Sequence, residues 1–367
     1  MKSKYKKIFI LGSYHGNNFG DLEILDSILS KLHRDFKITL LSKSGFKIRT
    51  KLASQYFETG MISFVNPFNY IKVLFNIIKA DVLIIGGGGL FFSHSVMDTL
   101  KVKGRSQLIY WLKCTILAKL LGKKVYWFGV GMGPFESFGN KLMYFTSKFV
   151  DRIFVRDQAS YSIMQSMVDK ARLKLASDVV FSKYDTRKIK KSLAPKSQYT
   201  KNKILIIAFE KDNNLPKLEK MLTQLKTHNF KLTIASSNPD KDNKFNKTLS
   251  QKLKIDFLDT TNLTIAEFRN IFSRYELVIS MRMHPLLMAF QQGTPGIGLA
   301  DKLPKIVEIQ DQLYSHPLYT TDYEVDNLVI DAQKIMLTNQ NNLLSYYAEN
   351  YTKADKAFTD IISLISR

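Results

Sequence analysis

The sequence has a single cysteine, Cys114, and this scarcity narrows the possible chemistry. One thiol excludes an intramolecular disulfide and a cysteine-cluster metal site, and it fits a reducing compartment. Because the surrounding residues 108–121 are mostly apolar, we expect Cys114 to be buried by packing rather than used as a nucleophile. The six histidines form no H-x-x-x-H pair, and no other metal-ligand spacing stands out. We therefore expect no metal site.

Long apolar runs and acidic charge are also scarce. No uninterrupted apolar stretch reaches the roughly 18–20 residues of a membrane-spanning helix, so we expect a cytoplasmic protein, soluble or peripheral at the inner face of the membrane. Lysine and arginine number 54 against 32 acidic residues, a formal charge of +22. This excess is compatible with a solvated basic surface or with contact to an anionic membrane or phosphorylated substrate. No nucleic-acid-binding module is recognised, and we expect no nucleic-acid partner.

What the sequence does contain is a repeated alternation of apolar strands and amphipathic helices. Its 367 residues are too many for one typical core and suit two α/β domains. The alternation predicts two Rossmann-like, doubly wound parallel sheets facing across a cleft. We expect an N-terminal domain at 1–185, a basic linker at 186–202, a C-terminal domain at 203–335, and a final helix at 336–367 that packs back on the first domain.

Two glycine-rich segments follow predicted strands in the first half. The first, residues 12–21, follows a strand and opens a helix; Asn17 and Asn18 there are suited to sugar hydroxyls or a phosphate, and Asp21 is suited to cap the helix. The alternative is a turn with a capped helix, and the spacing is not the dinucleotide fingerprint. The second, residues 86–89, predicts a loop whose backbone N–H groups bind an anion. The glycines concerned are Gly87, Gly88 and Gly89, with Gly131 after the next strand.

Basic side chains follow several strands. Arg156 is placed for a bidentate carboxylate or phosphate contact, or else forms a surface pair with Asp157. The strongest signal is Arg282 with His284 after the strand at 277–280. On an extended segment the two would point the same way, and together they could fix an anion and move a proton.

Taken in order, these segments resemble the polysaccharide pyruvyltransferase family. The resemblance spans about residues 8–310. Each motif is weak alone, but the ordered set is fairly specific. The motifs are Gly20-Asp21, the run from Asp81 to Leu90, Gly129-Val-Gly131 with Gly133-Pro134, Val155-Arg156-Asp157 with Ser160, Asp178, Arg282-x-His284 and Pro304-Lys305. The usual Tyr-Asp-Pro-Lys-like run is irregular here, which leaves Lys302 as an alternative to Lys305; the adjoining proline favours Lys305.

The resemblance implies a GT-B-type fold and transfer of a pyruvyl group from phosphoenolpyruvate to a sugar of a surface polysaccharide or its lipid-linked precursor. It implies His284 as general acid, Arg156 and Lys305 as ligands of the donor's phosphate and carboxylate, and Arg282 in an assisting role. Phosphoenolpyruvate is then a co-substrate, and no cofactor is expected. Two alternatives remain: a GT-B glycosyltransferase that uses a nucleotide sugar, and a non-catalytic binding protein directed by the basic charge.

Overall fold

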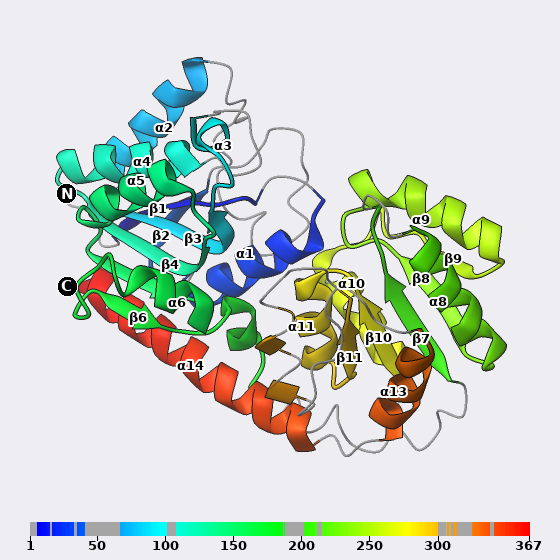
Figure 1. The fold of residues 1–367 in the computed structure, drawn as a ribbon. Helices are drawn as coiled ribbons and strands as arrows, with labels where there is room; N and C mark the ends of the chain where they lie inside the picture. The colour runs from blue at the N-terminus through cyan, green and yellow to red at the C-terminus, as the bar shows by residue number, and fades with distance from the viewer. Residues whose placement is uncertain are drawn as a thin grey trace. The chain divides into compact units, whose positions relative to one another are not determined.

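The computed structural model describes residues 6–14, 17–32, 35–40, 67–100, 108–185, 187, 202–210, 215–299, 306, 308–309, 312–313, 325–337 and 341–367. The chain divides into two compact units, and each unit is made of stretches that are not consecutive in the sequence (Figure 1). Unit 1 comprises Met1–Gly16, Ile24–Lys183 and Thr352–Arg367, and unit 2 comprises Asn17–Glu23 and Tyr184–Tyr351. No helix in the described ranges is both long and apolar enough to cross a membrane.

Unit 1 is built on a six-stranded parallel sheet of order β2-β1-β3-β4-β5-β6. The order changes direction between β1 and β3, and in open parallel sheets ligands bind at the carboxyl ends of the strands that flank such a point. The strands are β1 (Lys7–Leu11), β2 (Lys37–Leu40), β3 (Val82–Phe91), β4 (Lys124–Met132), β5 (Arg152–Val155) and β6 (Leu173–Leu175).

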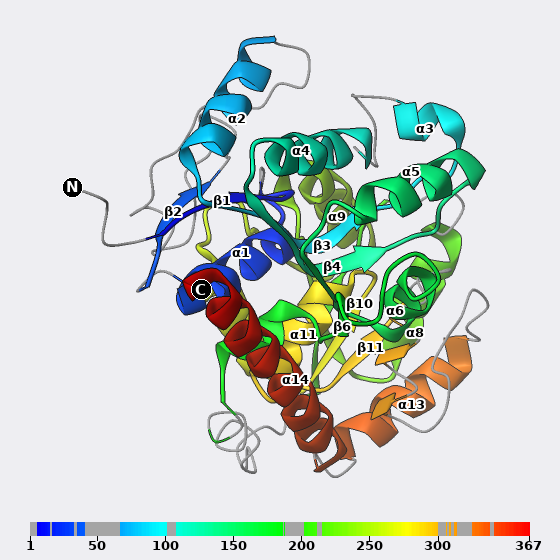
Figure 2. The same ribbon diagram turned by 90° about the vertical axis from the view of Figure 1, so that its left-hand side faces the viewer.

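Helices cover both faces of this sheet, as the alternation in sequence predicts (Figure 2). Alternate strand residues such as Phe9, Leu83 and Trp127 share a core with the helices on one face, and Phe128 on the other face meets Phe358 of the C-terminal helix. The helices are α1 (Phe19–Leu32), α2 (Pro67–Lys79), α3 (Val96–Leu100), α4 (Leu108–Leu120), α5 (Ser137–Ser147), α6 (Gln158–Met164), the 3₁₀ turn η2 (Val179–Lys183) and α14 (Asn341–Ser366).

Unit 2 has a five-stranded parallel sheet of order β11-β10-β7-β8-β9, which is the Rossmann strand order 3-2-1-4-5-6 without the sixth strand. Its change of direction falls between β7 and β10. The strands are β7 (Lys203–Ile207), β8 (Lys231–Ala235), β9 (Asp256–Leu258), β10 (Leu277–Ser280) and β11 (Gly296–Gly298).

Two core clusters fill the two faces of the unit 2 sheet. One joins strand residues to α8 (Leu215–Thr227) and α13 (Val325–Leu337). The other joins them to α10 (Ile265–Ile271), α11 (Met283–Gln291) and the first turn of α1, where the ring of Phe19 stacks on Phe268. The remaining elements are α9 (Pro239–Leu253) and the 3₁₀ turn η3 (Phe272–Arg274). The fold prediction of two Rossmann-like parallel-sheet domains is thus confirmed.

Local expectations were less accurate where glycine ends an apolar run. The loop expected at residues 86–89 is wrong, because β3 continues to Phe91 and pairs with β4 as far as Met132. A strand tolerates these glycines because the neighbouring strand holds them in the ladder. The short elements α3 and β6 and the helix α13 were not anticipated.

Candidate functional site

The carboxyl ends of β7 and β10 flank the change of strand direction in unit 2, and Arg282 lies just beyond β10. Arg282 is the extended residue that precedes α11, with φ −127° and ψ 141°. The Ser280 hydroxyl accepts the Arg282 backbone N–H at 3.0 Å and donates to the Arg282 carbonyl at 2.7 Å. This two-way bond fixes the backbone at the point where the side chain leaves the sheet edge.

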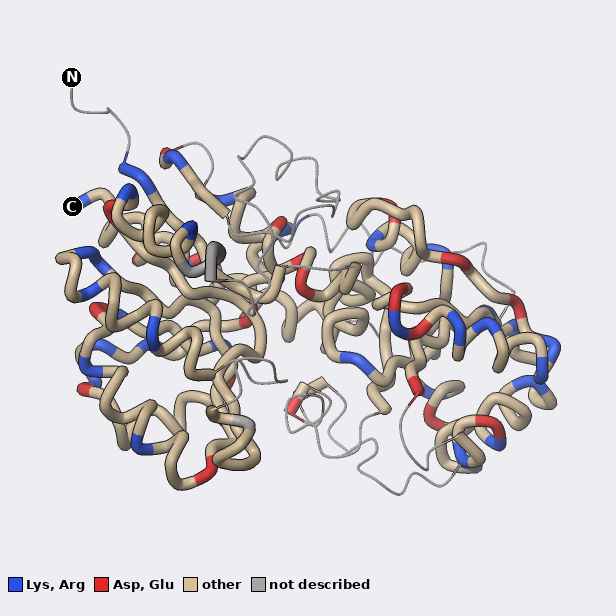
Figure 3. The backbone as a smooth tube through the Cα atoms, turned by 90° about the horizontal axis from the view of Figure 1, so that it is seen from above, with Lys and Arg blue, Asp and Glu red and all other residues tan. Residues whose placement is uncertain are grey.

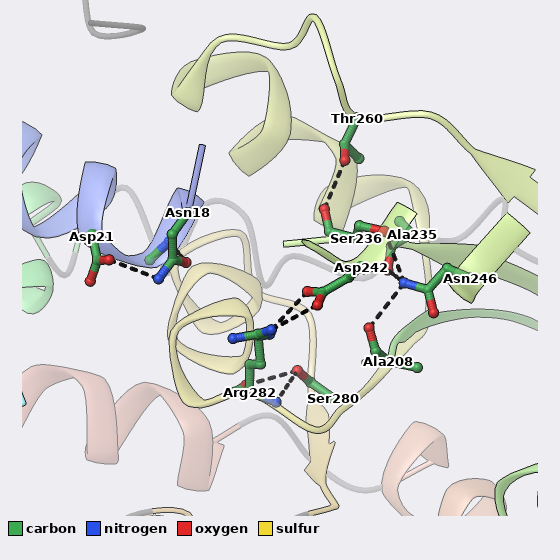
Figure 4. A network of polar contacts seen from close by, with 11 residues as sticks. Asn18, Asp21, Ala208, Ala235, Ser236, Asp242, Asn246, Thr260, Ser280 and Arg282 are labelled. Carbon is green, nitrogen blue, oxygen red and sulfur yellow. Dashed lines mark hydrogen bonds and ion pairs between the residues drawn. The ribbon is translucent and has the colours of Figure 1, made fainter. Parts of the chain in front are cut away.

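The Arg282 guanidinium is held by a buried carboxylate and an aromatic ring. Its Nη2 donates to both carboxylate oxygens of Asp242, at 3.0 and 2.8 Å, as Figure 4 shows. Its Cζ lies 4.6 Å from the ring centroid of Phe209, which follows β7. Burial raises the pKa of the Asp242 carboxyl, and the cation of Arg282 offsets only part of that rise. The buried Nε of Arg282 makes no hydrogen bond to any described residue. The Nε–H is thus a buried donor without a partner among the described residues.

His284 lies in the first turn of α11 and packs directly on the start of α1. A Cβ atom added at Gly20 would lie 2.8 Å from Nδ1 of His284 and 3.0 Å from its Cβ and Cγ. Only glycine leaves room for the imidazole here. The expectation that Arg282 and His284 share an extended segment is wrong, because α11 already begins at Met283. The two side chains come from a helix cap and a first turn instead.

The asparagines of the first glycine-rich segment join the same unit. Asn18 accepts the Gly20 backbone N–H at 3.1 Å and donates to Asp21 at 2.8 Å, while Asn17 donates to Asp240 at 2.7 Å. The capped-helix interpretation of this segment is therefore seen directly, with Asn18 rather than Asp21 as the cap. The backbone N–H of Phe19 also bonds the Ser237 carbonyl at 2.9 Å, so this turn is attached to the strand ends of unit 2.

A buried ion pair anchors the other end of this turn. Arg269 of α10 binds the carboxylate of Glu23 through Nε and Nη2, and the two side chains are almost fully buried. The Nη1 of Arg269 donates to the Tyr184 hydroxyl at 3.1 Å. Unit 2 thereby brings together Asn17, Asn18, Asp21, Arg282 and His284, all of which the sequence had singled out.

The glycines predicted to bind a ligand in unit 1 lie inside strands. Gly87 has φ +72° and a Cβ there would collide with Ile24 of α1, so the backbone conformation and the packing both require glycine. The Tyr14 hydroxyl donates to the Gly86 carbonyl, across the change of direction between β1 and β3. Gly88 has φ +84°, and Gly89 pairs with Gly131 of β4.

Arg156 is a buried member of a charged cluster in unit 1, not half of a surface pair. Its Nη1 donates to Asp178 at 3.0 Å, and its Nε lies 3.4 Å from a carboxylate oxygen of Asp157. Asp157 caps α6 by accepting the Ser160 backbone N–H at 2.8 Å. Two carboxylates thus fix the plane of the guanidinium. Lys302 and Lys305 lie outside the described residues.

A comparison with models of known protein families shows which family this chain belongs to. The sequence model of the polysaccharide pyruvyl transferase family matches residues 3–302. This chain belongs to that family. The match takes in both sheets and every residue of the predicted site except Lys305. A search of curated proteins finds no match for this pyruvyl transferase family member.

Solved structures resemble this pyruvyl transferase family member in fold. UDP-GlcNAc 2-epimerase from Neisseria meningitidis bound to UDP-GlcNAc has a TM-score of 0.59 at 12% identity, over 99% of this chain and 100% of that one. The Rickettsia bellii epimerase has a TM-score of 0.61 at 13% identity, over 99% and 97%. Anabaena HepE in complex with UDP and glucose has a TM-score of 0.57 at 12% identity, over 99% of each chain. These are GT-B-like nucleotide-sugar proteins, and identity this low establishes only a shared fold.

Sequence reasoning missed the partners that orient the site of this family member. Asp242 and Phe209, which hold Arg282, follow different strands from it, and no local pattern connects them. Asp242 lies in the first turn of α9, where an acidic residue is ordinary, so its buried role had no sequence signal. No group of three or more possible metal-ligating side chains occurs among the residues that the structure describes.

Proposed function

We propose that this chain transfers a pyruvyl group from phosphoenolpyruvate to a sugar of a cell-surface polysaccharide or its lipid-linked precursor, forming a pyruvate ketal. The main support is that an imidazole, His284, lies against the start of α1 beside an arginine with one buried N–H unused, in a chain of the pyruvyl transferase family. The single cysteine fits a cytoplasmic location for the reaction.

The proposed reaction needs one proton donor and two sugar hydroxyls. Protonated His284 gives its proton to the methylene carbon of phosphoenolpyruvate, which becomes a methyl group next to an oxocarbenium-like carbon. Imidazole suits this step because it exchanges a proton near neutral pH. One sugar hydroxyl adds to that carbon and returns its proton to His284. The second hydroxyl displaces phosphate, and its proton leaves with the phosphate, so atoms and charge balance.

The donor carries three negative charges, and the proposal assigns them to basic side chains rather than to a cofactor. Arg156 and Lys305 bind its phosphate and carboxylate, and Arg282 assists through the N–H groups that Asp242 does not use. Asn17, Asn18 and Asp21 bind sugar hydroxyls, as do the backbone groups near Gly87, Gly88, Gly89 and Gly131. The side-chain amides of Asn17 and Asn18 now donate to Asp240 and Asp21, so a sugar hydroxyl would have to replace each carboxylate as the hydrogen-bond acceptor.

The alternative is a glycosyltransferase that uses a nucleotide sugar. The specific observation in its favour is that solved structures of similar fold hold UDP-GlcNAc or UDP. Fold likeness is weak support for a shared ligand, since one fold carries many chemistries. Such an enzyme would want a carboxylate in the second domain to bind a ribose, and Glu308 is present there but poorly placed in the sequence for that role.

A donor screen separates the two functions. Thermal shift of the purified protein is measured with phosphoenolpyruvate and with UDP- and GDP-sugars, for the wild type and Arg156→Lys. Phosphate release is then followed with phosphoenolpyruvate and candidate glycan acceptors. We expect stabilisation by phosphoenolpyruvate, and near-complete loss of phosphate release in His284→Ala.

The matched control is His228→Ala, because His228 is an exposed histidine of the same unit whose ring bonds the Gln224 carbonyl one turn earlier. It should leave phosphate release unchanged. Stabilisation by a nucleotide sugar but not by phosphoenolpyruvate would favour the glycosyltransferase. An active His284→Ala protein would remove His284 from the acid role while leaving the donor assignment intact.

A further inference from the structure

Exposed large hydrophobic side chains are concentrated on one layer of unit 1. Thirteen of the fifteen in the described residues belong to unit 1, and twelve of these lie on α2, α3, α5 or at the end of α4. A soluble surface usually scatters such residues singly, so a concentration of this kind marks an interaction site. We call these four helices the outer layer. Their exposed residues are Ile71, Leu74, Phe75, Ile78, Val96, Met97, Leu100, Leu120, Leu121, Phe138, Tyr144 and Phe145.

Helix α2 carries exposed apolar side chains in addition to those that it buries in the core. Val73 and Ile77 face the core of unit 1, as expected for a helix on a sheet. The opposite face carries Ile71, Leu74, Phe75 and Ile78, spaced at i, i+3, i+4 and i+7. That spacing forms a continuous apolar stripe on a helix, yet Ile71 is 60% exposed. The helix is thus apolar on both sides, and among the described residues only the side with Val73 and Ile77 belongs to the core.

The helices of the outer layer adjoin one another. The Lys123 ammonium at the end of α4 donates to the Ile78 carbonyl of α2 at 2.7 Å, and α3 packs on α4 and α5. Figures 1 and 2 agree that α2, α3, α4 and α5 lie side by side on one face of the sheet. Leu121 and Leu120 lie two and three residues before Lys123, at the end of α4 that this contact joins to α2, and Leu120 is 74% exposed.

Charge on the outer layer is almost entirely positive. Residues 67–80, 95–100, 108–124 and 136–148 contain eight lysines and only two acidic residues, Asp98 and Glu136. Lysine and arginine are otherwise spread over both units (Figure 3). Asp151, just outside these ranges, lies 2.7 Å from Lys119 and 3.8 Å from Lys124, so the excess of positive charge on this face rests on the other six lysines. Two lysines lie over exposed aromatic rings of the layer: Lys79 is 3.9 Å from the Phe75 centroid, and Lys148 is 4.4 Å from that of Tyr144.

We propose that the outer layer of unit 1 binds the surface of an anionic lipid bilayer. Apolar side chains flanked by lysines enter the boundary between head groups and acyl chains, and the lysines bind the lipid phosphates. Long lysine stems suit this boundary because they bury their methylene groups while the ammonium stays in water. The proposal does not depend on the donor or the acceptor. A lipid-linked acceptor would, however, be presented at such a surface.

Vesicle flotation tests this surface directly. The full-length protein is mixed with phosphatidylglycerol-containing vesicles and, separately, with phosphatidylcholine vesicles. Binding is expected only to the anionic vesicles and should weaken as salt is raised. Ile71→Glu should reduce binding at least tenfold. The double variant Lys72→Glu with Lys79→Glu should reduce the affinity for vesicles by about fivefold or more per lysine. Each cation near an anionic bilayer contributes about 1 kcal/mol of binding free energy, which corresponds to about fivefold in affinity.

The matched control is Ile330→Glu, because Ile330 is 47% exposed on α13, a helix of unit 2 that is not part of the outer layer. It should bind like the wild type, and all variants should melt at the wild-type temperature because the replaced side chains are exposed. Equal loss in Ile330→Glu and Ile71→Glu would overturn the proposal, as would equal binding to both vesicle types. A dimer that Ile71→Glu converts to a monomer, without vesicle binding, would assign the face to a second copy instead.

Discussion

Gly20 offers the sharpest test of how the two parts of the unit 2 site fit together. Replacing a helical glycine with alanine ordinarily stabilises a helix by up to about 1 kcal/mol. At Gly20 the new methyl group would stand 2.8–3.0 Å from Nδ1, Cβ and Cγ of His284. The Cβ and Cγ atoms are the ones nearest the His284 backbone, and Cβ does not move when the side chain changes rotamer, so a rotamer change alone cannot relieve the clash. Either α1 or the imidazole must move.

The expected magnitude follows from these opposing effects. Overpacking of this kind costs about 1–3 kcal/mol, which exceeds the helix-propensity gain. We expect Gly20→Ala to lower the free energy of unfolding by about 1–2 kcal/mol, or the melting temperature by about 2–8 °C, seen by calorimetry. In the proposed reaction His284 is the acid, and displacing it should cost far more in rate than in stability, since a shift of about 1 Å can cost ~100-fold. Phosphate release should therefore fall at least ~10-fold.

The matched control is Gly122→Ala at the end of α4. Gly122 has φ +70° and no atom within 4 Å of an added Cβ, so alanine there should cost backbone strain alone and leave the rate unchanged. Our reasoning about His284 would be refuted by a Gly20→Ala protein that is more stable than the wild type and fully active. Loss of activity in both variants would instead indicate a general effect of alanine substitution.

Three further outcomes follow from buried polar groups. Glu23→Ala should destabilise the protein by about 3–5 kcal/mol in denaturant unfolding, because it leaves Arg269 buried without its carboxylate, and Glu23→Leu with Arg269→Met should recover most of the loss. Asp178→Asn should cost about 1–3 kcal/mol by weakening the bond to Arg156; an unchanged unfolding midpoint would contradict this. Burial raises the pKa of Cys114 to about 12, so a thiol reagent at pH 8 should label it only at the rate of unfolding. The free energy of unfolding should also fall as pH rises above 9.0, the ordinary pKa of a cysteine thiol. Above that pH the Cys114 thiol ionises in the unfolded chain but stays protonated in the folded one.

The fold could be predicted because each strand and helix carries its own periodic signal. Residues such as Ile204 and Ile206 fill one face of a sheet, and Leu218 and Leu222 fill the facing stripe of α8. The signal fails for elements that are too short to show a period. Leu173–Leu175 is a strand only because β5 lies beside it, and its three residues resemble any loop.

The site was predictable only as far as its residues are neighbours in sequence. Arg282 and His284 were found together because they follow one strand. That Gly20 lies against His284 depends on the packing of Phe19 on Phe268, some 250 residues later in the chain. Likewise, nothing local marks Asp242 as the partner of Arg282. The geometry of the site depends on contacts between segments that are distant in the sequence, and no local pattern in one sequence indicates them.

Charge balance within unit 2 bears on how a donor with three negative charges would be held. Arg282 is already neutralised by Asp242, and Asp21 and Asp240 bring further negative charge to the turn that packs on His284. The described part of this site therefore has no net positive charge to offer. Arg282 is better suited to orient a donor through its buried Nε than to attract one. Arg156 lies between Asp157 and Asp178 and is neutralised in the same way, so of the proposed donor ligands Lys305 is the one left to attract the anion. Nucleotide-sugar proteins share these sheets, so the choice of anionic donor depends on a few cations at the strand ends.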